Sequence, residues 1–170
     1  YKNYSNLISS TGISSLKGSL SNLPAIICSA GPSLDKNIQY LQAKRNNFLL
    51  ISVATALAPL NKNGLSPDFI VAIDPDEITI NFFDLKNNSE NTWLLYNPVV
   101  PSIIPDTFPS RRLTYDSSVY IAQWLQKYLG GKGSLEKIFS VAHAASQFAK
   151  FIGCGPIIFI GQDLSFSQKR

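Results

Sequence analysis

Small or polar residues follow four short apolar runs of the sequence, and side chains of these types could bind a ligand. The carboxyl ends of parallel strands meet at one edge of a sheet, and open α/β sheets bind their ligands at that edge, so these residues are expected to converge. None of the four groups is specific by itself, and the prediction of a site depends on their convergence. The runs and the residues after them are AIICS (25–29) before Gly31-Pro32-Ser33, FIVAI (69–73) before Asp74-Pro75-Asp76, WLLY (93–96) before Asn97-Pro98, and PIIFIG (156–161) before Gln162-Asp163.

The turn Gly31-Pro32-Ser33 could hold a phosphate group, because a helical pattern with Leu34, Ile38 and Leu41 follows it. The N–H groups and the partial positive charge at a helix N-terminus attract anions. Small residues let a phosphate approach the backbone, and the hydroxyl of Ser33 adds a donor. The alternative is a tight turn in which Ser33 only serves as the helix N-cap. The turn matches neither the Walker A motif nor G-x-G-x-x-G.

Carboxylates follow two of the runs. Asp74 and Asp76 come directly after FIVAI (69–73) and could hold a divalent metal, or Asp74 could accept hydrogen bonds from a ribose or a base. The alternative is a turn capped by Asp-Pro. Gln162 and Asp163 follow the last run in the same way, and a turn or a cap is the alternative there too.

No catalytic residue can be assigned from the sequence. Ser134 is expected to cap a helix over 134–152, which places Ser140 inside that helix. His143 is the single histidine and lies at the edge of the apolar stripe, where a packing role is the more common one. A Ser-His-Asp hydrolase is not expected, because G-x-S-x-G is absent. A candidate general base is expected beyond Arg170.

The pattern of apolar runs predicts a doubly wound α/β fold, with a mainly parallel sheet and helices on both faces. Continuous apolar runs without alternation are typical of strands buried on both sides. Strands are expected at the four runs above and at FLLISV (48–53), and helices from Ser33, over 117–129 and over 134–152. We interpret residues 1–22 as a lead-in segment, 23–170 as one domain, and the proline-rich stretch 97–116 as a surface loop.

Composition excludes several classes of protein. The net charge of +4 is spread along the chain, so nucleic-acid binding is not expected. The longest apolar stretch, 48–60, is too short to span a bilayer, and a cytoplasmic location is expected. Cys28 and Cys154 stand among apolar or small residues and are interpreted as buried free thiols. Because the chain has no methionine and begins with Tyr1, we expect a fragment of a longer protein.

Three blocks of the sequence resemble the MptE-like domain over roughly residues 23–167: PAIICSAGPSLDKNI, SPDFIVAIDP and SVAHAASQFAKFIGCGPIIFIGQDLSFS. This domain occurs in motility accessory factor (Maf) proteins, which are glycosyltransferases that attach nonulosonic acids to flagellin. It also occurs in archaeal 6-hydroxymethylpterin diphosphokinases. A more distant likeness is to bacterial sialyltransferases that use CMP-activated sugars. The resemblance implies a Rossmann-like fold that binds a nucleotide.

The resemblance also implies roles for individual residues. The turn Gly31-Pro32-Ser33 would line the nucleotide phosphate, and Asp74 and Asp163 would face the ligand cleft. Ser140 stands where the family often has a Gly-Ser-Val turn at a helix start, here Phe139-Ser140-Val141. The nucleotide-binding set that we predict joins these residues to Asn97 and Gln162.

The resemblance implies two activities, and a non-enzymatic function is kept as a third alternative. The first is transfer of a nonulosonic acid from a CMP-sugar donor to Ser or Thr of flagellin, with no obligatory metal. The second is ATP-dependent pyrophosphoryl transfer to a hydroxymethylpterin, which would need Mg²⁺ at Asp74 and Asp76. The third is a non-catalytic module that acts through partners.

Overall fold

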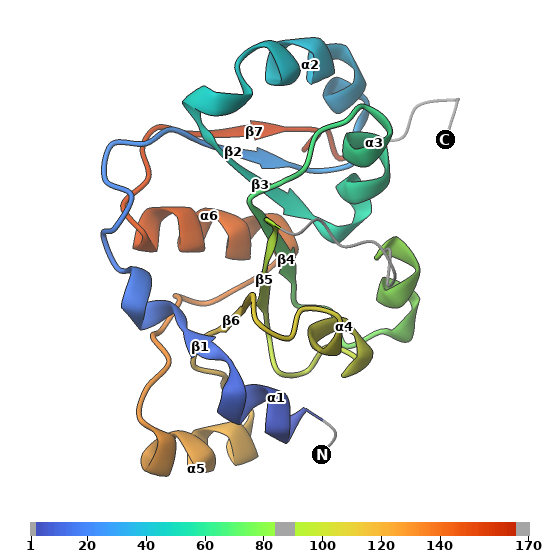
Figure 1. The fold of residues 1–170 in the computed structure, drawn as a ribbon. Coiled ribbons are helices and arrows are strands. Elements are labelled where there is room, and N and C mark those ends of the chain that lie inside the picture. Colours follow the sequence, from blue (N-terminus) through green and yellow to red (C-terminus); the bar gives the residue numbers. More distant parts are fainter. Residues whose placement is uncertain (1–2, 84–90, 166–170) are drawn as a thin grey trace.

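The computed structural model describes residues 3–83 and 91–165 and has a parallel sheet at its centre (Figure 1). The described strands form one sheet in the order β1-β6-β5-β4-β3-β2-β7, and every neighbouring pair is parallel. The predicted mainly parallel sheet is confirmed, and the five expected strands agree with the structure to within one residue at each end. The strands are β1 (Thr11–Gly12), β2 (Ala25–Cys28), β3 (Leu49–Val53), β4 (Phe69–Ala72), β5 (Trp93–Tyr96), β6 (Arg112–Thr114) and β7 (Ile157–Ile160).

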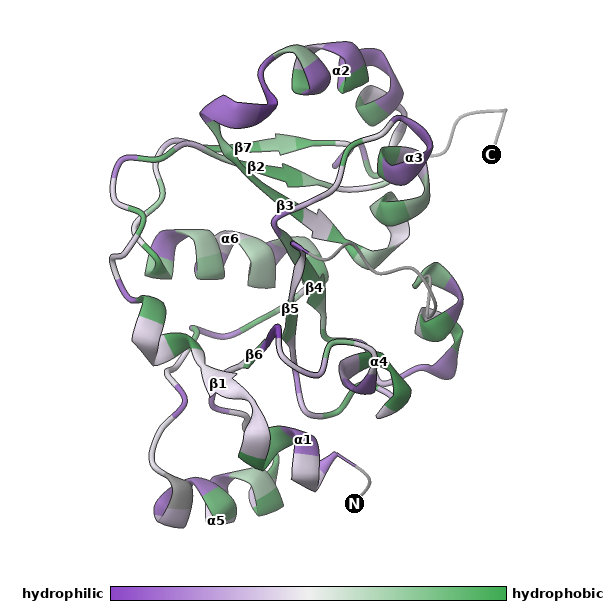
Figure 2. Cartoon of the chain, in the orientation of Figure 1, coloured by the Kyte–Doolittle hydropathy of each residue, from purple (hydrophilic) through white to green (hydrophobic). Residues whose placement is uncertain are grey.

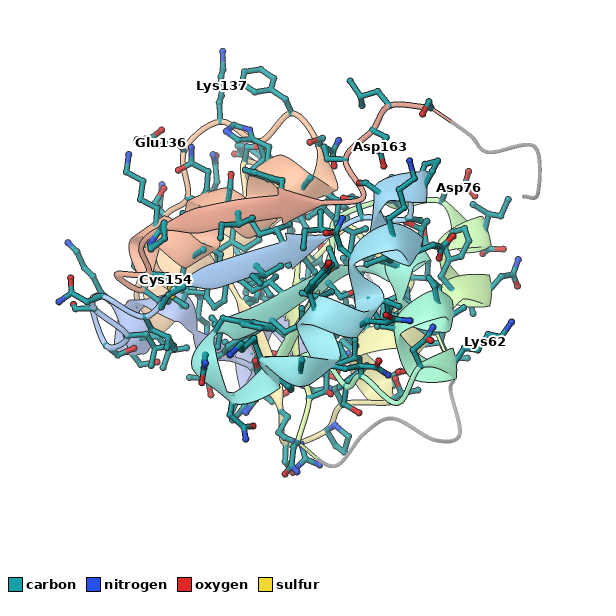
Figure 3. The ribbon with its side chains drawn as sticks, turned by 90° about the horizontal axis from the view of Figure 1, so that it is seen from above. Lys62, Asp76, Glu136, Lys137, Cys154 and Asp163 are labelled. Atoms are coloured by element: carbon teal, nitrogen blue, oxygen red, sulfur yellow. The ribbon has the colours of Figure 1, made fainter. Side chains whose placement is uncertain are left out.

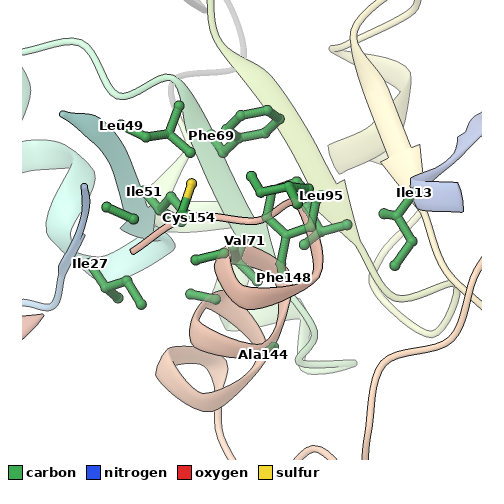
Figure 4. Packing of buried hydrophobic residues seen from close by; sticks show 14 of the residues in the cluster. Ile13, Ile27, Leu49, Ile51, Phe69, Val71, Leu95, Ala144, Phe148 and Cys154 are labelled. Atoms are coloured by element: carbon green, nitrogen blue, oxygen red, sulfur yellow. The ribbon is translucent and has the colours of Figure 1, made fainter. Parts of the chain in front are cut away.

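Helices cover both faces of the sheet, as the doubly wound fold predicts. Ile27, Ile51 and Val71 point to α6 on one face, where Phe148 packs edge-to-face on Phe69 with ring centroids 5.0 Å apart (Figure 4). Alternate residues of the same strands pack on the other face against α2, α3 and α4. The helices are α1 (Tyr4–Ser9), α2 (Pro32–Ala43), α3 (Leu57–Lys62), α4 (Ile103–Asp106), α5 (Tyr120–Leu129) and α6 (Val141–Phe151), with 3₁₀ turns η1 (Ile13–Leu16), η2 (Arg45–Asn47), η3 (Ala54–Ala56) and η4 (Glu77–Phe82).

The central strands are apolar except for Ser52 in β3, whereas α2 carries both apolar and polar residues (Figure 2). Helices cover both faces of these strands, and this explains why their sequences are continuous apolar runs. Cys28 and Cys154 are free and buried, as expected, and burial raises the pKa of the Cys28 thiol from 9.0 to about 12. Within the described residues, no helix is long and apolar enough to cross a membrane.

The direction of chain progression reverses at β2. From β2 the chain adds β3, β4, β5 and β6 in turn on one side, and α6 then returns it to β7 on the other side of β2. β2 and β7 are parallel neighbours, so the segments that follow them begin side by side at the carboxyl edge of the sheet. This topology places the sequence-predicted residues after β2 and β7 next to each other.

The interpretation of 97–116 as a surface loop is wrong. This stretch contains α4 and β6, and Leu113 and Thr114 of β6 are buried between β5 and β1. The strand has only three residues and its neighbours are polar or proline, so no apolar run marks it in the sequence. The lead-in segment 1–22 contributes α1, β1 and η1, and β1 forms the edge of the sheet beside β6.

Three predicted helix starts also differ from the structure. The helix expected over 134–152 begins at Val141, and Ser140, not Ser134, is its N-cap. Leu135 and Ile138 pack against the core from an irregular segment, and their spacing imitates the helical period. At α2 the N-cap is Gly31, and Ser33 lies within the first turn of the helix. The helix expected over 117–129 begins at Tyr120.

Candidate functional site

A cavity of about 300 Å³ lies at the carboxyl edge of the sheet, and most of the segments that the sequence singled out reach it. The start of α6 forms one wall, and the residues after β2, β3, β4 and β7 form the others. Its volume is at the lower limit of small-molecule sites. The lining residues are Ser29, Val53, Ala54, Thr55, Val71, Ala72, Ile73, Asp74, Thr79, Phe82, Ser140, Val141, Ala142 and Gln162.

The start of α6 brings backbone donors to this cavity. Val141 and Ala142 are its first two residues, and N–H groups at these positions have no acceptor within a helix. Ser140 caps the helix, because its Oγ accepts a hydrogen bond of 3.1 Å from the N–H of His143. Helix N-termini carry partial positive charge, so this wall favours an anionic group.

The residues after β2 and β7 are joined to one another by hydrogen bonds. Ser29 Oγ donates to Gln162 Oε1 at 2.7 Å, which fixes the Gln162 amide at the cavity. The backbone N–H and the hydroxyl of Ser33 both donate to Asp163 Oδ2, at 2.9 Å and 2.8 Å. Ser33 Oγ in turn accepts from the N–H of Gly161 at 2.9 Å. The donors of Ser33 are therefore occupied by a carboxylate of the same chain.

This contact explains why the turn after β2 has no bulky side chain. A Cβ atom at Gly31 would overlap the Asp163 carboxylate and the carbonyl oxygen of Gly161. Figure 3 shows Asp163 just beyond the end of β7 and beside the start of α2. Asp76 lies on the same side of the molecule, and Cys154 lies at the opposite end of the sheet. The turn is small so that the segments after β2 and β7 can pack closely at the carboxyl edge of the sheet.

Asp74 and Asp76 occupy different places in the turn after β4. Asp74 lines the cavity, and its Oδ1 accepts from the N–H of Asp76 at 3.0 Å. Asp76 Oδ1 accepts from the N–H of Ile78 at 3.0 Å and caps η4. Residues 3–83 and 91–165 contain no group of three or more His, Cys, Asp or Glu side chains that could hold a metal ion. One Asp74 oxygen thus remains for a ligand, while Asp76 has a capping role.

Two other candidates lie outside this cavity. Asn97 lines a neighbouring cavity, where its Nδ2 donates to the hydroxyl of Tyr115 at 3.1 Å. His143 stacks on the ring of Phe139 with centroids 5.5 Å apart, and its Nδ1 accepts from the N–H of Phe139. Both contacts of His143 are with the neighbouring Phe139, so the structure gives His143 a packing role.

Sequence reasoning missed Ser29, Thr55 and the first residues of α6. Ser29 ends the run AIICS (25–29) and Ala54-Thr55 follows FLLISV (48–53), so the same rule that identified Asp74 could have found both. Apolar periodicity did not indicate the start of α6, because it placed the helix start earlier, whereas the family resemblance already put Ser140 in the predicted set.

The Asp163 contact predicts a pH-dependent stability. Hydrogen bonds from the backbone N–H and then the hydroxyl of Ser33 lower the pKa of Asp163 below its ordinary value of 3.8. A carboxyl whose pKa is lowered by folding stabilises the fold above its unfolded pKa and loses that contribution as the pH falls through its folded pKa. Asp163→Asn is therefore expected to lower the urea midpoint at pH 7 and to reduce the loss of stability below pH about 4. Identical urea midpoints for both proteins at pH 7 would contradict this.

Comparisons with known proteins agree with this fold. A Maf glycosyltransferase from Magnetospirillum magneticum AMB-1 is similar in structure, with a TM-score of 0.76 and 19% sequence identity over 97% of this chain and 28% of that one. An uncharacterized protein of Treponema pallidum (strain Nichols) is 40% identical over 55 residues, which are 32% of this chain and 26% of that protein. The matches thus cover about a quarter of the length of each relative. The family model described as 6-hydroxymethylpterin diphosphokinase MptE-like matches residues 1–169, and the chain therefore belongs to the MptE-like family.

Proposed function

We propose that the cavity at the carboxyl edge binds a nucleotide and that the domain belongs to a transferase. The observation that carries this proposal is the shared cavity itself, in which the start of α6, Asp74 and Gln162 meet at a topological switch region. Membership of the MptE-like family supports a nucleotide-dependent transferase, and the similar fold of the Maf glycosyltransferase is consistent with it. The favoured reaction is transfer of a nonulosonic acid from a CMP-sugar to Ser or Thr of flagellin.

The phosphate of the nucleotide is assigned to the start of α6. Val141 and Ala142 line the cavity, their N–H groups have no acceptor within the helix, and the helix adds its positive end. Donors fixed in this way stabilise negative charge as CMP departs, with no metal required. The turn Gly31-Pro32-Ser33 is assigned to the rim, because a phosphate could contact Ser33 only if Asp163 moved away.

Asp74 and Gln162 are assigned to the nucleoside. The free Asp74 oxygen can accept a hydrogen bond from a ribose hydroxyl or from a base amino group, whereas the Gln162 amide, held by Ser29, can donate one. Both groups are exposed enough to meet a ligand that enters from solvent.

Pyrophosphoryl transfer from ATP to a hydroxymethylpterin is the second candidate, favoured by the description of the family model. Mg²⁺ is often held by one or two carboxylates together with substrate phosphates, so Asp74 fits this requirement and Asp76 could add a ligand only through the oxygen that does not cap η4. When bound, the ion would neutralise the charge of the triphosphate.

Titration calorimetry separates these candidates. Binding of CMP without Mg²⁺ supports sugar transfer, and binding of ATP only with Mg²⁺ supports pyrophosphoryl transfer. If neither nucleotide binds at millimolar concentration, both enzyme functions fail for this domain, and the non-catalytic module becomes the better explanation.

Asp74→Asn is expected to weaken CMP binding about tenfold, in line with the loss of one hydrogen bond to a charged group. Asp76→Asn is the matched control, because Asp76 caps η4 and does not line the cavity. Under the CMP proposal the control keeps its affinity, as measured by calorimetry. Equal losses in both variants that appear only with Mg²⁺ and ATP would instead support pyrophosphoryl transfer.

A further inference from the structure

The turn η4 forms part of the wall of the cavity at the carboxyl edge. Its residues Thr79 and Phe82 line this cavity. The turn is capped by Asp76 at its start and contacts η3, whose Ala54 also lines the cavity. The position of η4 at the cavity is therefore set by contacts within the fold.

Two neighbouring phenylalanines at the end of η4 lie in different surroundings. Phe83 is 6% exposed, and its ring meets that of Phe108 edge-to-face with centroids 6.4 Å apart. Phe82 is 40% exposed and lines the cavity. Packing of Phe83 in the core thus anchors the segment, while part of the Phe82 side chain remains in contact with solvent beside the cavity.

The exposed ring of Phe82 is suited to a flat ligand. Among the described residues that line this cavity, Phe82 is the only aromatic one. Apolar surface in contact with water is stabilised when a ligand covers it, and aromatic rings favour offset stacking with other flat rings. A nucleobase is a ligand of this kind, because every base has a π-face that stacks on aromatic side chains.

The polar groups of the cavity agree with a base beside η4. Asp74 and Phe82 both belong to the segment that follows β4, whereas the donors assigned to the phosphate belong to the start of α6. A nucleotide has a flat base at one end and a charged phosphate at the other, so these two segments match its two ends. The Asp74 oxygen would accept a hydrogen bond at the edge of the base, and a ring would contact its face, so the two interactions do not compete.

We propose that Phe82 binds the nucleobase by stacking and so positions the nucleotide in the cavity. The inference rests on the proposed nucleotide site and adds to it the residue that contacts the face of the base. Because stacking tolerates every base, the assignment applies to a CMP-sugar and to ATP alike.

Titration calorimetry of the whole chain tests this assignment, with CMP as the first probe and ATP with Mg²⁺ as the second. Phe82→Leu keeps an apolar side chain but removes the ring, and it is expected to weaken the nucleotide that binds about tenfold. Phe82→Tyr keeps the ring and should bind as the wild type does. Equal affinities of the wild type and Phe82→Leu would overturn the assignment of Phe82, while the nucleotide proposal would stand.

Ile78→Ala is the matched control on the same turn. Ile78 is 58% exposed and is not part of the cavity lining, so its replacement should leave nucleotide affinity unchanged. Urea unfolding separates binding from a structural role, because the replacement of a partly exposed side chain in Phe82→Leu should leave the urea midpoint close to that of the wild type. An equal loss of affinity in Ile78→Ala, or a clearly lowered midpoint in Phe82→Leu, would indicate a structural role and overturn the assignment.

NMR observes the contact itself. In the stacked complex the ring protons of Phe82 lie against the base, so nuclear Overhauser effects between the two are expected. A nucleotide that binds without them would place the base elsewhere and refute the role of Phe82 alone. Absence of nucleotide binding by the wild type at millimolar concentration would refute the nucleotide proposal, and this inference with it.

Discussion

Replacing Gly161 with alanine is expected to destabilise the protein by about 3 to 5 kcal/mol, because backbone strain and a steric overlap act together. Gly161 has φ +77°, a conformation that side chains with a Cβ atom rarely adopt. A Cβ atom there would also overlap the carbonyl oxygen of Ser29, so the loops after β2 and β7 would have to separate. Urea unfolding measures this loss.

Gly64→Ala is the matched control. Gly64 has φ +68°, close to that of Gly161, but a Cβ atom there meets no heavy atom within 4 Å. Its cost should be about 1 to 2 kcal/mol, the cost of the left-handed conformation alone. Equal losses in the two variants would show that the close approach of the loops after β2 and β7 has no energetic importance.

Replacing Phe148 with alanine is expected to cost about 3 to 5 kcal/mol of unfolding free energy. Phe148 is fully buried between α6 and the sheet, where its ring meets Phe69 edge-to-face at 69°. The truncation removes this aromatic contact and leaves a cavity at the centre of the core, between β4 and the helix that carries the proposed phosphate site. Chemical denaturation followed by the far-UV signal measures the change.

Phe139→Ala provides the comparison for this substitution. Phe139 is 80% exposed and packs on His143, so its loss should cost less than about 1 kcal/mol. A Phe148→Ala variant as stable as Phe139→Ala would contradict the assignment of Phe148 to the core.

The sheet could be predicted from the sequence wherever a strand is buried on both faces. Continuous apolar runs gave β2, β3, β4, β5 and β7 with their parallel direction. Two short strands, β1 and β6, were not predicted because two or three residues do not form a run. Their pairing with each other joins residues about a hundred positions apart.

The sequence predicted those parts of the candidate site that follow directly from strand ends, but not the contacts between distant loops. The rule that polar residues gather at the carboxyl ends of parallel strands correctly brought Asp74 and Gln162 to one edge. The rule could not show that Asp163 occupies the donors of Ser33, because that contact joins residues 130 positions apart. The start of α6 depended on a cap, Ser140, that apolar periodicity could not distinguish from an interior position.

A crystal structure of the domain with CMP bound would examine the nucleotide site most directly. The phosphate is expected within hydrogen-bond distance of the N–H groups of Val141 and Ala142, with the nucleoside against Asp74 and with Asp163 still bonded to Ser33. CMP found elsewhere, such as in the apolar hollow between α1, α4 and α5, would contradict the assignment of the carboxyl edge.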